Sequence, residues 1–129
     1  MKINMSSIMV DDQAKALAFY TDLLGFVTKH NIQMDYVSYI TVVSPDGPEG
    51  VELSLEPNGN PAVPAKEWQK ALYDAGIPAT SFGVGDVQAE YERLTSLGVT
   101  FTTEPTTHEE GFSTAVFDDT CGNLIMIVG

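Results

Sequence analysis

The sequence predicts an α+β fold built from two consecutive βαβββ modules, each with one helix after its first strand. Two amphipathic helical patterns, at residues 11–26 and 85–99, each follow a short apolar strand pattern and precede three more. A constant offset of 74 residues maps Asp12 onto Asp86 and Leu53 onto Ile127, which indicates an internal duplication. Two such modules packed together would complete a core that one module leaves half covered.

The first module is predicted at residues 1–56. Its helix follows an N-cap at Asp11 or Asp12 and stops at Gly25. The spacing places one stripe of the helix toward the core: Ala14, Leu17, Ala18, Thr21 and Leu24. Strands are predicted at 3–10, 25–30, 36–44 and 50–56.

A linker and a connecting helix are predicted at residues 57–76. The linker is indicated by the turn-rich stretch "EPNGNPAVP", because Pro, Gly and Asn interrupt regular structure. The helix that follows ends at Gly76, and its predicted stripe consists of Trp68, Ala71, Leu72 and Ala75.

The second module is predicted at residues 77–129. Its helix is again opened by an Asp and closed by a Gly, with Val87, Glu90 or Tyr91, Leu94 and Leu97 on one stripe. Strands are predicted at 78–84, 99–103, 112–118 and 123–128. The length of 129 residues suits one autonomous domain.

Period-2 alternation assigns two faces to the strands, since neighbouring residues point to opposite sides of a sheet. The uniformly apolar face, predicted to pack on the helices, carries Ile8, Val10, Val51, Leu53, Phe82, Val84, Ile125 and Ile127. The opposite face mixes small, polar and apolar residues, as expected where a curved mixed sheet surrounds a cleft. It carries Met5, Ser7, Met9, Glu52, Ser54, Ala79, Ser81, Leu124, Met126 and Val128.

Composition restricts the class of partner. The net charge is −12 with six Lys and Arg, so no basic stripe is present to displace counterions from a nucleic acid. No segment approaches the roughly 20 apolar residues that span a bilayer. The lone Cys121 cannot form an internal disulfide, so we expect a cytoplasmic protein with a reduced thiol. The acidic field would attract cationic small molecules.

The motifs "VDDQAKALAFYTDLLGF", its echo "VGDVQAEYERLTSLGV" and the closing "DDTCGNLIMI" together resemble the vicinal oxygen chelate superfamily. This family includes glyoxalase I, extradiol dioxygenases, and fosfomycin and bleomycin resistance proteins. The resemblance covers nearly the whole chain and implies a single glyoxalase-like domain that holds a divalent metal on a concave sheet. Matched by motif, the four ligand positions are Met5, Glu52, Ala79 and Met126.

The chain departs from the ligand pattern that the resemblance implies. Metal-binding members place His, Glu or Gln at three or four of these positions, whereas this chain retains only Glu52. A catalytic zinc site uses three protein ligands, and a non-haem iron site uses two His and one carboxylate. We therefore expect neither a metal site nor a cofactor.

Glu52 is the predicted catalytic residue, because a carboxylate on the cleft face could act as general base or hold a cation. The alternative is a hydrogen-bonded remnant of an ancestral metal site, and Glu56 or Glu49 could lie at the cleft rim. The predicted ligand-binding residues share small, soft or aromatic side chains on this face or on the neighbouring strands. They are Met5, Ser7, Met9, Tyr36, Tyr39, Ser54, Ala79, Ser81, Phe112 and Met126.

Ordinary packing is the competing interpretation for the Met and aromatic residues. The "HEE" at 108–110 lacks the spacing of a helical zinc motif and is interpreted as a solvated loop. Cys121 has no basic neighbour in sequence and is not interpreted as a nucleophile.

Three function hypotheses follow. The first is a metal-independent protein, forming a homodimer, that binds a cationic or aromatic small molecule, as the drug-sequestering branch of the resembled family does. The second is a Glu52-dependent or metal-dependent enzyme such as a glyoxalase-like lyase, an isomerase or a dioxygenase. A collapsed cleft that serves only dimerisation or regulation is a third possibility.

Overall fold

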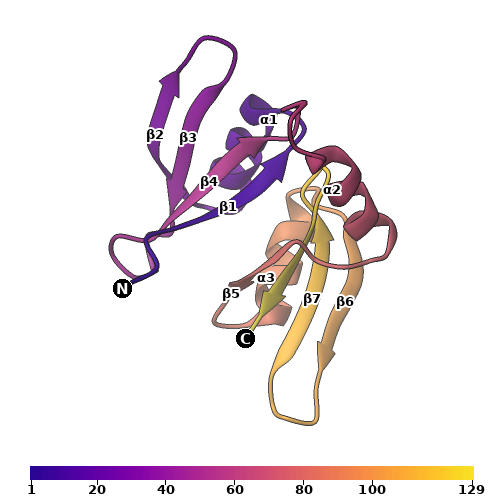
Figure 1. Cartoon of the computed structure of the whole chain (residues 1–129). Helices are drawn as coiled ribbons and strands as arrows, with labels where there is room; N and C mark the ends of the chain where they lie inside the picture. Colours follow the sequence, from indigo (N-terminus) through magenta and orange to yellow (C-terminus); the bar gives the residue numbers. More distant parts are fainter. The chain divides into compact units, whose positions relative to one another are not determined.

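A computed structural model describes all residues, 1–129, and divides the chain into two compact units. Unit 1 is Met1–Lys66 and unit 2 is Glu67–Gly129. Each unit contains a four-stranded mixed sheet and a helix that follows the first strand (Figure 1). The predicted α+β fold with two βαβββ modules is confirmed.

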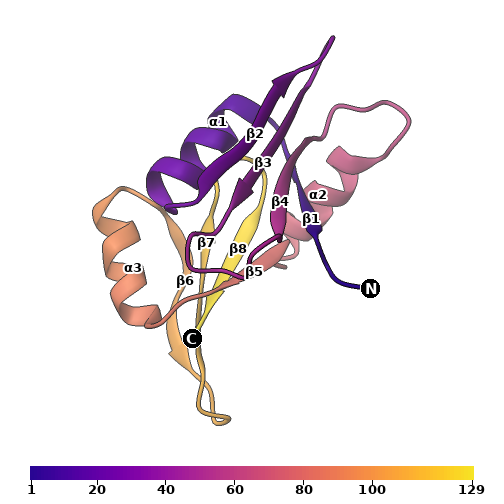
Figure 2. The same cartoon turned by 90° about the vertical axis from the view of Figure 1, so that its left-hand side faces the viewer.

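In unit 1 the strand order is β1-β4-β3-β2. The strands are β1 (Met5–Val10), β2 (Val27–Gln33), β3 (Ser38–Val43) and β4 (Glu52–Pro57). β1 pairs with β4 in parallel, and the other pairs are antiparallel. Helix α1 (Gln13–Ala18) and the π-helical segment η1 (Phe19–Leu23) follow β1, and α1 contacts β3 and β4 (Figure 2). The helix therefore covers one face of this sheet.

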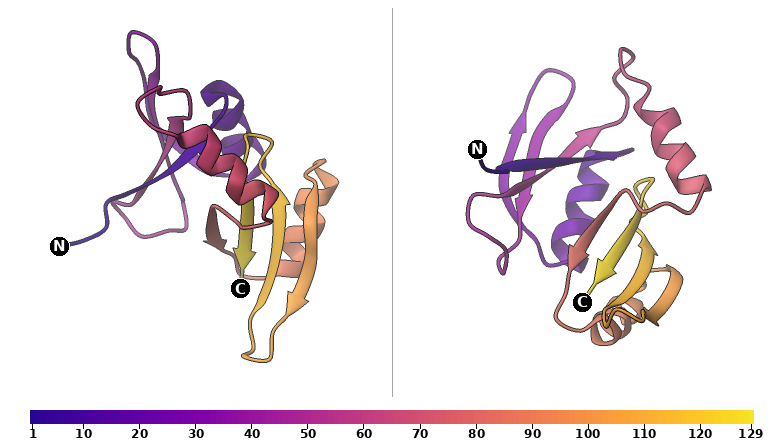
Figure 3. Two further views of the ribbon diagram at one scale, coloured as in Figure 1. Left: turned by 45° about the vertical axis from the view of Figure 1, so that its right-hand side comes forward. Right: turned by 60° about the horizontal axis from the view of Figure 1, so that its bottom comes forward.

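Unit 2 repeats the topology with the order β5-β8-β7-β6. Its elements are β5 (Thr80–Gly83), α3 (Val87–Ser96), β6 (Phe101–Thr107), β7 (Ser113–Asp118) and β8 (Leu124–Val128). Helix α3 contacts β6 and β7 (Figure 3). The connecting helix α2 (Ala65–Asp74) crosses the boundary between the units. No helix of the chain is long and apolar enough to cross a lipid bilayer.

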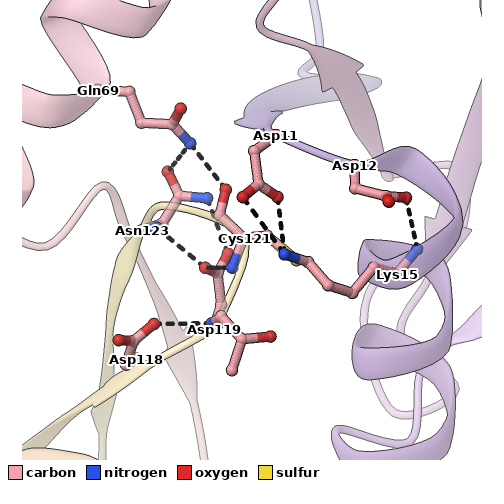
Figure 4. Close-up of polar contacts among 9 residues, drawn as sticks. Asp11, Asp12, Lys15, Gln69, Asp118, Asp119, Cys121 and Asn123 are labelled. Carbon is pink, nitrogen blue, oxygen red and sulfur yellow. Dashed lines mark hydrogen bonds and ion pairs between the residues drawn. The ribbon is translucent and has the colours of Figure 1, made fainter.

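The two module helices begin in the same way. Asp12 Oδ1 accepts a hydrogen bond from the Lys15 backbone N–H, and Asp86 Oδ1 accepts one from the Ala89 N–H, each at 3.0 Å. Figure 4 shows the first of these caps. Both predicted N-caps are confirmed, because each carboxylate satisfies an N–H that has no partner within the helix.

The first module helix contains one more residue than the second. Its last turn is the π-helical segment η1, and a π turn accommodates an extra residue. The caps Asp12 and Asp86 are 74 residues apart, whereas the glycines that follow the helices, Gly25 and Gly98, are 73 apart. Both glycines have positive φ, +81° and +89°, as expected after a helix end.

The predicted buried stripe of the first helix is correct only in part, since Leu17, Thr21 and Leu24 are half-buried. Ala14 and Ala18 are exposed, whereas Ala16, Phe19 and Tyr20 are buried. The helix turns its two aromatic residues to the core because they remove more apolar surface from water than the alanines would.

The predicted stripes of α2 and α3 are also correct only in part, and of the stripe predicted for α2 only Leu72 is half-buried. Trp68 is 59% exposed, whereas Gln69 of the same helix is buried. In α3, Val87 and Leu94 are buried as predicted, but Leu97 is exposed. The difference in α2 arises because a polar network draws Gln69 inward.

That network joins α2 to the β7–β8 turn within unit 2 (Figure 4). The buried Asp119 carboxylate accepts hydrogen bonds from the backbone N–H groups of Cys121 and Asn123, at 2.8 and 2.9 Å, and from Asn123 Nδ2 at 2.7 Å. Gln69 Nε2 donates to the Cys121 carbonyl and to Asn123 Oδ1, at 3.1 and 3.0 Å. Tyr73 Oη donates to Asp118 at 2.6 Å. The motif "DDTCGN" thus forms a structural turn, in which Cys121 is buried.

The prediction of which strand residues face the helices is correct for the central residues. Ile8, Val10, Ile125 and Ile127 are buried as predicted, while the remaining members of the helix-facing set are half-buried: Val51, Leu53, Phe82 and Val84. Leu124, which was assigned to the opposite face, is also buried. The edge strands β2 and β6 extend beyond their predicted ends because polar residues continue them, and an edge strand tolerates polar residues on both sides.

Candidate functional site

The site begins with the sheet face of unit 1 that α1 does not cover, called here the open face. Strand register fixes its members, because residues paired across neighbouring strands share a face. Met5, Ser7 and Met9 pair with Glu52, Ser54 and Glu56. The row continues through Thr41, which pairs with both Ser54 and His30, and through Tyr39, which pairs with Ile32.

A groove of about 710 Å³ lies at one end of the open face. It is formed by the ends of β1 and β4, by the turn between β2 and β3, and by the linker that leads to α2. The lining residues are Met9, Asp11, Met34, Tyr36, Val37, Ser38, Tyr39, Glu56, Pro57, Asn58, Gly59, Asn60, Pro61, Val63, Ala65 and Lys66. This volume lies in the range of about 300–1,000 Å³ typical of small-molecule pockets.

The side chain of Gln13 holds two walls of the groove together. Its Nε2 donates to the carbonyls of Ser38 and Leu55, at 2.6 and 2.9 Å, and its Oε1 accepts from the Ser38 backbone N–H at 3.0 Å. Sequence reasoning missed Gln13 because its partners are 25 and 42 residues away.

The groove combines soft and aromatic walls with carboxylates. Met9, Met34, Tyr36 and Tyr39 supply polarisable and flat surface. Glu56 lies in the groove, half-buried, and its Oε1 accepts a hydrogen bond from Ser54 Oγ at 2.5 Å. Met9, Tyr36 and Tyr39, which are predicted ligand-binding residues, all line this groove, as does Glu56.

Asp11 also lines the groove, but it is engaged by a lysine. Its carboxylate oxygens lie 3.1 and 3.3 Å from Lys15 Nζ, as Figure 4 shows. Both side chains are close to half exposed, so this pair is a weak surface ion pair. Glu56 is therefore the carboxylate of the groove that forms no ion pair with a lysine or arginine, and Lys66 also lines the groove.

Glu52 lies on the open face outside the groove lining and is paired. Its Oε1 is 2.6 Å from Lys29 Nζ, and its Oε2 is 3.9 Å from His30 Nε2. The hydrogen bond from Lys29 is the main reason that the pKa of Glu52 lies below its ordinary value of 4.5, and the Thr41 hydroxyl lowers this pKa further. Thr41 Oγ1 and Glu52 Oε2 are both buried, and neither makes a hydrogen bond of normal geometry. A carboxylate held ionised in this way is a weak general base.

Residues 2–127 match the model of the Glyoxalase/Bleomycin resistance protein/Dioxygenase superfamily. The chain belongs to this superfamily.

One relative of this superfamily member is a protein of Bacillus subtilis (strain 168) described as uncharacterized protein YurT. It is 58% identical over 128 residues, which cover 99% of this chain and 98% of the relative.

Solved structures share the fold. UcmS2 has a TM-score of 0.84 and 30% identity, over 99% of this chain and 97% of that chain. A superfamily member from Sphaerobacter thermophilus DSM 20745 has a TM-score of 0.74 and 29% identity, over 99% and 96%. TnmS3 from Streptomyces sp. CB03234, described as an antibiotic binding protein, has a TM-score of 0.76 and 23% identity, over 98% and 93%. The likeness to TnmS3 shows the fold alone.

The metal-ligand positions implied by the superfamily resemblance are divided between the units. Met5 pairs with Glu52 in unit 1. In unit 2, Met126 pairs with Ser81, and the Ala79 backbone N–H donates to the Leu124 carbonyl at 2.8 Å. The constant offset of 74 residues predicts that Ala79 pairs with Met126, as Met5 pairs with Glu52. The observed partner of Met126 is Ser81, two residues further along the strand.

The donors at these positions do not fit a divalent metal. Met5 and Met126 are thioethers, Ala79 offers only a methyl group, and the single carboxylate, Glu52, is paired with Lys29. No group of three or more His, Cys, Asp or Glu side chains is placed to hold a metal ion. We therefore derive no chemistry through a metal for this superfamily member.

The last predicted ligand-binding residue is Phe112, at the tip of the β6–β7 hairpin in unit 2. Its ring stacks on His108, with ring centroids 4.6 Å apart. His108 Nε2 lies 2.8 Å from Thr114 Oγ1, and Gly111 takes a positive φ of +91°. The "HEE" segment thus forms a turn whose imidazole packs against an aromatic ring.

Proposed function

We propose that this protein binds a cationic small molecule with an aromatic part in the groove of unit 1, and that Glu56 is the counter-charge. The observation that carries the proposal is a half-buried carboxylate among Met and Tyr side chains in a pocket of ligand size. A desolvated carboxylate attracts a cation more strongly than an exposed one does, and the net charge of −12 adds long-range attraction.

Two further considerations support binding without catalysis. Glu52, the predicted catalytic residue, is paired with Lys29 and has a lowered pKa, which makes it a poor proton acceptor. A structural neighbour, TnmS3, is described as an antibiotic binding protein, so the fold is compatible with this class of ligand. We also propose that the protein is a homodimer in the cytoplasm, and that Met9, Tyr36 and Tyr39 contact the ligand in the groove.

The test is isothermal titration of metal-free protein with pairs of aromatic compounds that differ only by an amine or a quaternary ammonium group. The cationic member of a pair should bind more tightly to the wild type. Glu56→Gln should weaken that binding about fivefold, because a hydrogen bond to a charged group is worth roughly 1 kcal/mol more than one to a neutral group.

Two matched variants serve as controls. Glu52→Gln changes a carboxylate on the same strand face outside the groove, and Glu110→Gln changes an exposed carboxylate of unit 2. Both should bind the cationic compounds as the wild type does. Equal binding of cationic and neutral compounds, or an unchanged affinity in Glu56→Gln, would contradict the proposal.

A further inference from the structure

Two consecutive residues of β2 reach the same carboxylate, which a regular strand does not allow. Neighbouring side chains of a strand point to opposite faces. Nevertheless Lys29 Nζ lies 2.6 Å from Glu52 Oε1 and His30 Nε2 lies 3.9 Å from Glu52 Oε2. The two contacts therefore require an irregularity in β2.

A β-bulge at Lys29 is the irregularity in β2. The register of β2 on β3 changes from Thr28 opposite Val42 to His30 opposite Thr41, so Lys29 is the extra residue between two paired ones. Bulges re-aim a side chain, and they occur often beside functional sites. Here the bulge brings the ammonium group to the open face, on the same side as the imidazole.

The pair lies where the resemblance implies a metal ligand. Among the four implied positions only Glu52 is a carboxylate, and its side chain is 13% exposed. One of its oxygens contacts Lys29, and the other is buried without a well-formed hydrogen bond and lies toward His30. The sheet thus presents a carboxylate and an imidazole side by side, with a lysine ammonium on the carboxylate.

We propose that Lys29 is a resident cation that takes the place of a divalent metal beside Glu52 and keeps such ions off the open face. The ammonium group contacts Glu52 Oε1, and its positive charge repels any metal ion that approaches Oε2. Without Lys29, Glu52 and His30 would supply one oxygen and one nitrogen donor, a combination suited to Zn²⁺ or Ni²⁺ rather than to Mg²⁺. This role is independent of the small molecule proposed for the groove.

The test uses NiCl₂ alone as the probe, at neutral pH, with isothermal titration and with NMR to locate the paramagnetic broadening. Lys29→Met keeps the length of the side chain and removes its charge. This variant should bind Ni²⁺ at least about tenfold more tightly than the wild type, which corresponds to about 1.4 kcal/mol. The broadening should centre on His30, Thr41 and Glu52.

Three variants control the result. Lys29→Arg retains the cation and should bind Ni²⁺ as weakly as the wild type. Lys29→Met combined with His30→Ala should lose the gain. Lys29→Gln, whose amide can still donate to Glu52, repeats the test with a smaller disturbance should Lys29→Met fail to fold.

Two results would overturn the inference. One is that Lys29→Met and Lys29→Gln, both folded by circular dichroism, bind Ni²⁺ no more tightly than the wild type. The other is that the wild type already binds Ni²⁺ stoichiometrically with broadening at Glu52. Neither result bears on the groove, because no organic ligand takes part in the experiment.

Discussion

Two glutamates on one strand face have different environments. Glu52 and Glu56 both point to the open face from β4, but only Glu52 is neutralised by a lysine. Glu56 accepts a hydrogen bond from Ser54 and lies against Met and Tyr side chains in the groove. Four residues along a strand correspond to roughly 13 Å, so one ligand group does not contact both carboxylates.

The pairing of Glu52 predicts a specific dependence of stability on pH. Because its pKa in the folded protein lies below the ordinary value of 4.5, ionised Glu52 stabilises the fold above about pH 4.5, and this contribution is lost as the pH falls through the lower folded value. The difference in free energy of unfolding between wild type and Glu52→Gln should therefore be constant near neutrality and shrink below pH 4.5. Urea denaturation at a series of pH values measures it.

Glu110→Gln is the control for this prediction, since Glu110 is exposed. The free energy of unfolding of Glu110→Gln should stay close to that of the wild type at every pH measured. If the difference in free energy of unfolding between wild type and Glu52→Gln grew on acidification, the folded protein would prefer protonated Glu52. That result would contradict the lysine contact.

The sequence could identify Glu52 as unusual but not its partner. Alternation along the strands correctly placed Glu52, Met5 and Ser7 on one face. The contact between Lys29 and Glu52 could not be predicted, because regular alternation places Lys29 and His30 on opposite faces of the sheet. Only the bulge brings both side chains to Glu52. Bulges depend on the pairing of two strands, so a single strand pattern does not reveal them.

Among the elements, the β7–β8 turn contains a buried polar network. Asp119 is completely buried, and its carboxylate accepts three hydrogen bonds within the turn. Gln69 extends the network to α2. This network explains why a polar residue of α2 points inward while Trp68 stays exposed, an arrangement opposite to the one that apolar spacing predicted.

Removing the Asp119 carboxylate should be among the most destabilising single changes in the chain. In Asp119→Ala the donors of Cys121 and Asn123 stay buried without their acceptor, and each buried donor left unsatisfied costs roughly 1–3 kcal/mol. We expect a loss of about 3 kcal/mol or more in the free energy of unfolding, measured by chemical denaturation. Asp46→Ala, at an exposed position of the β3–β4 connection, should cost less than about 0.5 kcal/mol.

Helix boundaries could be predicted from the sequence more reliably than helix faces. Both N-caps and both closing glycines follow from local chemistry, an Asp side chain at one end and a positive φ at the other. The buried face depends on what lies across the interface. Phe19 and Tyr20 are buried because their large rings suit the sheet, and the π-helical segment that contains them also shifts the later residues of the helix by one position.

At the scale of the whole molecule, the duplication predicted from the sequence is present as two units with the same strand order. The offset of 74 residues holds at the N-caps and becomes 73 after the helices, and the pairing of β5 with β8 differs in register from that of β1 with β4. These differences leave the alternation of faces intact. The offset therefore predicted the topology and the faces, but not the exact partner of Met126.

The homodimer that we propose predicts a mass in solution of twice 13.9 kDa. Large apolar side chains of the open face are exposed, with Ile32 at 54% and Met5 at 38%, and β2 is an edge strand with unpaired backbone groups. A second copy packed on this surface would remove its apolar side chains from water. Sedimentation equilibrium of the wild type at micromolar concentration should report the dimer, and Ile32→Asp should shift it toward the monomer by placing a charge on that surface. Asn31→Asp adds the same charge at the next, exposed position of β2 and should leave the dimer intact; a wild type of monomer mass, or equal effects of the two variants, would contradict a dimer formed through the open face.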